Sequence, residues 1–225
     1  MPLPRKLQAV VFDMDGLLFD TEVLYRDTIL AAAARRGRAM DISVYLKMVG
    51  LPVEGSRAVC MEHFGPDFDF ATFWAEVIQE VRALADTQLR LKAGVVELLD
   101  LLDEARLPRA IATSSRREAV DHHLGVHGLT HRFHTIVAKG DYAQGKPHPE
   151  PYLTAAARLG VDPAGCLALE DSHNGVRSAA AAGMMTIMVP DLLTATAEIE
   201  ALCVTVSESL HHVRALVTRH LAAAS

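Results

Sequence analysis

The sequence has 225 residues, of which 50% are hydrophobic and 22% are charged, a balance typical of a folded globular chain rather than a disordered or collagen-like one. Lys and Arg together number 22 and Asp and Glu number 28, so the formal net charge is −6. A mildly acidic chain lacks the basic surface that binds nucleic acid, and we expect no nucleic-acid partner.

The first apolar run, residues 9–12, is followed at once by Asp13, too soon for a signal peptide or a membrane-spanning helix. No later stretch reaches 18 apolar residues, so we expect a cytoplasmic protein with no membrane partner. The three cysteines, Cys60, Cys166 and Cys203, are far apart and lack metal-ligand spacing. They predict free thiols in a reducing compartment.

A long interval after the first apolar run shows helical periodicity and no convincing strand. We predict helices over residues 22–36, 53–64 and 70–85. Trp74 and the neighbouring phenylalanines are interpreted as packing this layer rather than as a stacking platform. The interval therefore predicts an inserted all-helical cap domain, residues 18–88, that forms a lid over the edge of a sheet.

Short, unbroken apolar runs rich in Val, Ile and Leu recur along the chain, as expected of strands buried on both faces of a parallel sheet. We predict such strands at residues 9–12, 110–112, 135–138, 166–169 and 186–189. Helical patterns alternate with the later strands, at residues 95–105, 116–124, 151–159 and 174–182. This alternation predicts an α/β fold with a doubly wound, Rossmann-like parallel sheet, formed by residues 1–17 and 89–225.

Acidic residues follow two of the predicted strands, at the edge where open parallel sheets bind ligands. Asp13 and Asp15 follow the first strand, and Glu170 and Asp171 follow the fourth. Two like charges about 4 Å apart repel by roughly 4 kcal/mol at an effective dielectric constant of 20, so these carboxylates need a cation. Because all the candidate ligands are oxygens, the pattern predicts Mg²⁺.

A phosphate site is predicted beside the metal. Thr113 and Ser114 directly precede a helix that Ser115 and Glu118 are expected to cap with an S-x-x-E capping box. Free backbone N–H groups and the positive end of a helix attract anions. Lys146, from another loop, adds a positive charge.

These residues resemble the motifs of the haloacid dehalogenase superfamily, which contains aspartate-dependent phosphatases and phosphomutases. Its four motifs are matched, in order, by residues 13–22, Thr113, Lys146 with Pro147, and Glu170-Asp171. A D-x-D pair alone is common, but four ordered motifs at strand ends are specific. The resemblance covers nearly the whole chain, including a helical cap inserted after the first strand, as in the beta-phosphoglucomutase-like branch.

The resemblance implies that Asp13 is the nucleophile, which forms an aspartyl phosphate, and that Asp15 is the general acid and base. Thr113, the backbone N–H of Ser114 and Lys146 would hold the phosphate oxygens.

The resemblance also implies a set of metal ligands: Asp171, a carboxylate oxygen of Asp13 and the backbone carbonyl of Asp15. Glu170 is either a ligand or an outer partner acting through water.

The expected function is a Mg²⁺-dependent phosphomonoesterase that, as a monomer, hydrolyses a small phosphorylated metabolite such as a sugar or nucleoside monophosphate. One alternative is a hexose phosphate mutase of the beta-phosphoglucomutase type, and another is a non-catalytic metabolite-binding protein on the same scaffold. Against the mutase, Tyr25 stands where mutases usually carry His, and residues 49–53 lack the basic residues found around a cap glycine in mutases.

Two further patterns are rejected. Residues 140–146 spell G-x-x-x-x-G-K, but Pro147 stands where a P-loop needs Ser or Thr. Five histidines cluster nearby, but Gly125 and Gly128 interrupt any helix that would align them. We interpret them as solvated polar positions rather than a metal site: His122, His123, His127, His131 and His134.

Overall fold

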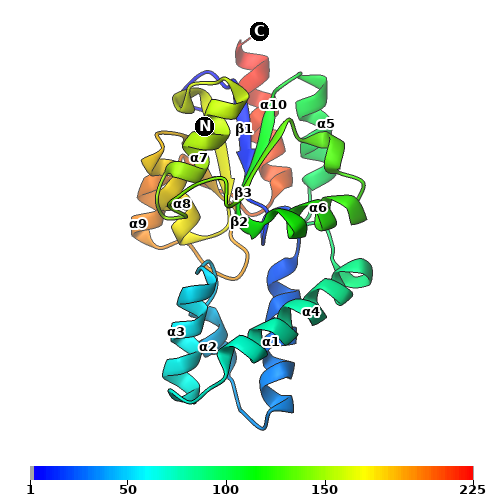
Figure 1. Ribbon diagram of the computed structural model, residues 1–225. Helices are drawn as coiled ribbons and strands as arrows, with labels where there is room; N and C mark the ends of the chain where they lie inside the picture. The colour runs from blue at the N-terminus through cyan, green and yellow to red at the C-terminus, as the bar shows by residue number, and fades with distance from the viewer. Residues whose placement is uncertain (1–2, 225) are drawn as a thin grey trace. The chain divides into compact units, whose positions relative to one another are not determined.

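The computed structural model describes residues 3–224, and within that range it contains one six-stranded sheet (Figure 1). The strands are β1 (Ala9–Phe12), β2 (Arg109–Arg116), β3 (Thr135–Lys139), β4 (Cys166–Glu170), β5 (Met185–Met188) and β6 (Thr205–Val206). All pairs are parallel, in the order β3-β2-β1-β4-β5-β6. The chain thus builds outward from β1 in both directions, which confirms the predicted doubly wound α/β fold.

Helices cover both faces of this sheet. Figure 1 shows α5 (Val95–Glu104), α6 (Arg117–Val126) and α10 (Leu210–Ala224) on one side, and α7 (Glu150–Leu159), α8 (His173–Ala181) and α9 (Ala197–Leu202) on the other. Two short 3₁₀ turns, Thr130–Arg132 and Pro163–Gly165, precede β3 and β4. All four residues of β1 are completely buried, as expected of a central strand covered on both faces.

The second compact unit is helical and comprises residues 20–90, whereas the sheet unit comprises the described residues up to Phe19 and from Leu91 onward. Its helices are α1 (Thr21–Arg35), α2 (Ile42–Leu46), α3 (Val53–Phe64) and α4 (Phe70–Gln88). Buried residues recur along α4 at four-residue spacing, at Phe73, Val77, Val81 and Ala85. This apolar stripe is the core of the helical unit.

The aromatic residues of the helical unit pack as predicted. Phe73 is fully buried and its ring lies 5.2 Å from that of Phe68. Trp74 is only partly buried, and it stacks on Phe70 at 5.4 Å and on Tyr25 at 6.5 Å.

The predicted capping box at Ser115 and Glu118 is wrong. Ser115 lies inside β2, and α6 begins at Arg117, with Arg116 as its N-cap and no side-chain cap hydrogen bond. The strand continues because Arg116 still pairs with Lys139 of β3. The argument that placed Thr113 and Ser114 at a helix N-terminus therefore fails.

The interpretation of His123 as a solvated residue is also wrong. His123 lies on α6, is only 5% exposed and packs its ring 5.7 Å from that of Phe19. Burial lowers its pKa, although the charge of Asp15 opposes that shift. The helix contains His123 and continues through Gly125 to Val126, so Gly125 does not interrupt it.

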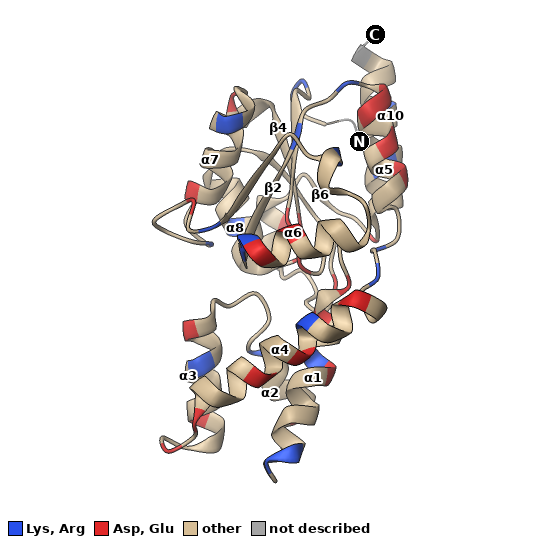
Figure 2. Ribbon diagram, turned by 45° about the vertical axis from the view of Figure 1, so that its right-hand side comes forward, with Lys and Arg blue, Asp and Glu red and all other residues tan. Residues whose placement is uncertain are grey.

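Acidic and basic residues are interspersed along the three longer helices of the helical unit. Figure 2 shows both signs along α1, α3 and α4. None of the helices within residues 3–224 combines the length and apolar character that a membrane crossing requires.

Candidate active site

Three buried carboxylates meet at the carboxyl ends of β1 and β4. Phe12 pairs with Leu169 in adjacent strands, so Asp13 and Glu170 emerge side by side, and Asp171 follows. One oxygen from each of these three side chains lies within 4.8 Å of the others. The structure thus brings together three of the predicted metal-site residues, each less than one-tenth exposed.

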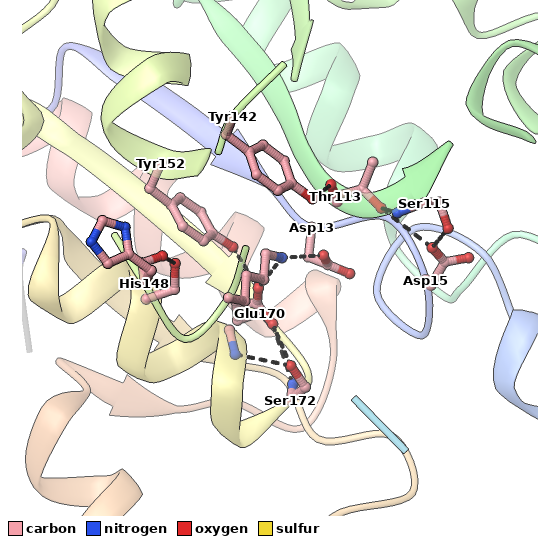
Figure 3. A network of polar contacts seen from close by, with 12 residues as sticks. Asp13, Asp15, Thr113, Ser115, Tyr142, His148, Tyr152, Glu170 and Ser172 are labelled. Atoms are coloured by element: carbon pink, nitrogen blue, oxygen red, sulfur yellow. Dashed lines mark hydrogen bonds and ion pairs between the residues drawn. The ribbon is translucent and has the colours of Figure 1, made fainter. Parts of the chain in front are cut away.

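The amine of Lys146 lies between two of these carboxylates. Its Nζ contacts Asp13 Oδ1 and donates to Glu170 Oε1 at 2.5 Å (Figure 3). The loop that carries Lys146 is tied to α7, because Glu150 accepts hydrogen bonds from the backbone N–H groups of Ala143 and Gln144, each at 2.8 Å. The next helix begins only at Glu150, which confirms that this segment is not a P-loop.

Electrostatics in this cluster are dominated by burial. Burial raises the pKa of Asp13 to about 8; Lys146 opposes the rise, whereas Glu170 and Asp15 add to it. Burial disfavours the charged form of Lys146, but Asp13 and Glu170 outweigh that cost and hold its pKa well above the ordinary value. The ammonium of Lys146 thus pairs with two of the three clustered carboxyl groups, and the oxygen-only donor set of the cluster fits a divalent metal ion.

Asp15 is held on a different side of the same sheet edge. Ser115 Oγ donates to Asp15 Oδ2 at 2.7 Å, and Thr113 Oγ1 lies 3.4 Å from the same oxygen (Figure 3). Within the described chain, Asp15 Oδ1 is buried and has no hydrogen-bond partner. One oxygen of Asp15 is therefore fixed, and the other remains available as a proton donor or acceptor.

The two predicted phosphate-binding residues of β2 differ in exposure. Thr113 is 1% exposed, and its carbonyl accepts a hydrogen bond from Tyr142 Oη at 3.0 Å. Ser114 is exposed.

Two further residues, Tyr152 and Ser172, hold the Glu170 carboxylate in place, and neither is a predicted site residue. Tyr152, on α7, donates to Glu170 Oε1 at 2.5 Å, and Ser172 Oγ donates to Glu170 Oε2 at 3.1 Å (Figure 3). Ser172 is the N-cap of α8, a role that its place before a helical pattern could have indicated. In the sequence, Tyr152 occupies an ordinary core-facing position of a predicted helix. Its contact with Glu170 arises only when the sheet and α7 pack together.

Known proteins share both this sequence pattern and this fold. The sequence profile of the haloacid dehalogenase-like hydrolases matches residues 10–189. The chain belongs to this family. It is therefore a haloacid dehalogenase-like hydrolase, as its motifs predicted.

Individual members of the family cover most of the chain. The "Probable pseudouridine-5'-phosphatase" of Drosophila melanogaster is 35% identical over 196 residues, 83% of each protein. Hexitol phosphatase B of Escherichia coli K12 is 34% identical over 205 residues, which cover 84% of this chain and 86% of that protein. The crystal structure of CbbY from Rhodobacter sphaeroides in complex with phosphate superimposes with a TM-score of 0.79 and 26% identity, covering 92% of this chain and 96% of CbbY.

Proposed function

We propose that this hydrolase is a Mg²⁺-dependent phosphomonoesterase that cleaves a small phosphorylated metabolite through an aspartyl-phosphate intermediate. The observation that carries the proposal is the buried cluster in which Lys146 contacts both Asp13 and Glu170 beside Asp171. A cluster with one ammonium and several carboxylates at the end of a sheet suits the transfer of a highly charged group, because catalysis of phosphoryl transfer is mainly positioning and charge stabilisation.

Asp13 is the proposed nucleophile. A carboxylate oxygen of Asp13 attacks phosphorus, the bond from phosphorus to the ester oxygen breaks, and Asp15 gives a proton to the departing oxygen. Asp15 then takes a proton from the water that attacks the aspartyl phosphate, which releases inorganic phosphate and restores Asp13. The hydrogen bond from Ser115 supports this role, because it orients the Asp15 carboxyl group.

Asp13 and Asp171 would hold the Mg²⁺, together with the backbone carbonyl of Asp15. Glu170 already accepts from Lys146 Nζ, Tyr152 Oη, and the backbone N and Oγ of Ser172. Since a carboxylate has about four acceptor positions, we assign Glu170 to the outer shell, where it holds Lys146. Bound Mg²⁺ supplies positive charge that offsets the charge of the phosphoryl oxygens.

Lys146 and Thr113 are the proposed phosphate-binding side chains. Lys146 stays charged over the working pH range because its carboxylate neighbours hold its pKa well above the ordinary value. Together with the backbone N–H of Ser114, these residues would grip the phosphoryl oxygens.

The substrate class is supported by two relatives, which are named for a nucleoside monophosphate and for hexitol phosphates. A sugar or nucleoside monophosphate is therefore the proposed substrate. Tyr25, whose ring stacks on Trp74, offers no positive charge for the second phosphate of a mutase intermediate.

Release of inorganic phosphate tests the proposal. The protein is assayed on p-nitrophenyl phosphate and on a panel of sugar, hexitol and nucleoside monophosphates, with Mg²⁺ and with EDTA. We expect turnover that EDTA abolishes, that Mg²⁺ restores and that Asp13→Asn lowers by at least about 10³-fold.

The matched control is Glu97→Gln, which removes the same charge from an exposed position on α5 and is expected to leave turnover unchanged. Full activity of Asp13→Asn, or activity indifferent to EDTA, contradicts the proposal. Absence of turnover on the whole panel favours the non-catalytic binding protein instead.

A further inference from the structure

Asp191 is an acidic residue at the same edge of the sheet that no motif includes. It follows β5 after Val189 and Pro190, and β5 pairs with β4, the strand that ends beside Asp171. Its side chain is nine-tenths buried. The carboxyl ends of adjacent parallel strands thus bring Asp191 toward the metal-site carboxylates.

The two carboxylate oxygens of Asp191 have different surroundings. Oδ1 accepts a hydrogen bond from Lys92 Nζ at 2.7 Å. Oδ2 is buried, and the described part of the chain offers it no hydrogen-bond donor. A buried acceptor without a donor costs folding free energy, so an unmet acceptor at this place points to a ligand or an ordered water.

The free oxygen of Asp191 and the carboxylate of Asp171 approach the same residue, Gly16. A methyl group placed on Gly16 would overlap Asp171 Oδ2 and would lie 3.4 Å from Asp191 Oδ2. Gly16 has a φ of +82°, and its lack of a side chain lets the Asp171 carboxylate approach the backbone here, near Asp191 Oδ2. Two carboxylate oxygens that approach the same point of the backbone repel each other unless a cation or a hydrogen-bond donor lies between them.

We propose that Asp191 is a positioning residue of the metal site, whose Oδ2 accepts a hydrogen bond from a water molecule bound to the divalent ion. The inference rests on the metal site of the proposed function. Asp191 lies outside the group of carboxylates whose oxygens are within 4.8 Å of one another, namely Asp13, Glu170 and Asp171. It therefore acts through water, which Mg²⁺ commonly retains in protein sites. Lys92 contacts Oδ1, which leaves Oδ2 for that water.

Direct metal binding tests the inference without an activity assay. Mn²⁺, a paramagnetic substitute for Mg²⁺, is titrated into the unliganded protein, and free Mn²⁺ is followed by electron paramagnetic resonance. Loss of an outer-shell partner typically weakens metal affinity about 10- to 100-fold, and we expect an increase of that size in the Kd of Asp191→Asn and of Asp191→Ser. Glu97→Gln, with the same loss of charge as Asp191→Asn, is expected to bind as the wild type does.

A second variant separates metal positioning from a purely structural ion pair. Lys92→Met breaks the same ion pair but keeps the free oxygen, so we expect its Mn²⁺ affinity to fall much less than that of Asp191→Asn. The inference is overturned if Asp191→Asn binds Mn²⁺ as tightly as the wild type does. It is also overturned if Asp191→Asn and Lys92→Met lose Mn²⁺ affinity equally. Neither result contradicts the metal site itself. A wild-type protein that binds neither Mn²⁺ nor Mg²⁺ overturns the metal site itself and, with it, this inference.

Discussion

The carboxylate of Glu170 is completely buried. The folded state therefore depends on the hydrogen-bond donors that surround this carboxylate. Tyr152 Oη is one of them, in a fully buried contact at 2.5 Å. We expect Tyr152→Phe to lower the free energy of unfolding by about 1–3 kcal/mol, because a charged acceptor in the interior loses a donor. Urea denaturation of the two proteins measures the difference.

Tyr142→Phe is the matched control for that experiment. It removes the same hydroxyl group, but Tyr142 Oη donates to the neutral backbone carbonyl of Thr113 in a partly buried place. We expect Tyr142→Phe to lower the free energy of unfolding by about 0.5–1.5 kcal/mol. If Tyr142→Phe proved as costly as Tyr152→Phe, the charge of Glu170 would not be what makes Tyr152 important.

Ser115 orients the proposed proton donor. Ser115→Ala removes the 2.7 Å hydrogen bond to Asp15 Oδ2, and we expect kcat for phosphate release to fall roughly 10- to 100-fold, the kinetic equivalent of one hydrogen bond to a charged group. Steady-state kinetics on the best substrate of the panel measures this change. The control is Ser43→Ala, at an exposed position on α2, for which we expect the wild-type kcat. A wild-type kcat in Ser115→Ala would contradict the orienting role.

At the scale of an element, α8 can approach β4 closely only because Gly175 has no side chain. A methyl group at Gly175 would overlap the carboxylate of Glu170. Gly175→Ala must displace either the helix or that carboxylate, so we expect it to destabilise the protein by about 1–3 kcal/mol, measured by thermal or urea unfolding.

Gly125→Ala supplies the contrast within the same fold. Gly125 also lies in a helix, α6, but a methyl group there meets no atom within 4 Å. Alanine is the better helix former, so this change is expected to stabilise the protein by about 0.5–1 kcal/mol. Destabilisation of similar size by both changes would point to a general intolerance of helix substitution rather than to the contact with Glu170.

The elements that the sequence predicted best are those in which burial alone sets the pattern. β1 is apolar throughout and β4 is apolar up to its last residue, Glu170, and both strands lie where expected, whereas β5 begins and ends one residue earlier than predicted. The two-residue strand β6 and the short helices α2 and α9 are too brief for a periodic signal. The pattern at Ser115 failed because pairing of β2 with β3 extends to Arg116 and outweighs a local capping preference.

Site residues divide in the same way. Asp13, Glu170 and Asp171 were predictable because each ends or follows an identifiable strand, and the parallel topology brings those ends together. Lys146 lies in a loop between β3 and α7, and its resemblance to a family motif marked it. Tyr152 and Asp191 were not predictable, since their neighbours are set by tertiary packing and no local pattern marks them. The prediction for His123 is wrong for the opposite reason: its sequence neighbours are largely polar, but its side chain on α6 is buried.

At the scale of the whole molecule, each unit has a core of its own. The chain leaves the sheet unit after Phe19 and returns to it at Leu91, and these two residues form an isolated β-bridge. Next to them, the backbone N–H of Asp20 donates to the carbonyl of Arg90 at 2.8 Å. Phe73 is fully buried in the core of the helical unit. We expect Phe73→Ala to lower the free energy of unfolding of the helical unit by about 3–5 kcal/mol, because it leaves a cavity between α4 and its neighbours.

Hydrogen exchange followed by mass spectrometry locates that loss. If the two cores open independently, Phe73→Ala accelerates amide exchange in α1, α3 and α4 and leaves β1 and β4 protected, because local opening draws only on the stability of the unit that opens. The matched variant is Leu99→Ala, which empties a fully buried position on α5 and should accelerate exchange in the sheet unit instead. Equal acceleration in both units by Phe73→Ala would mean that the protein unfolds as one cooperative whole, and the helical unit could then not open while the metal-site carboxylates stay in place.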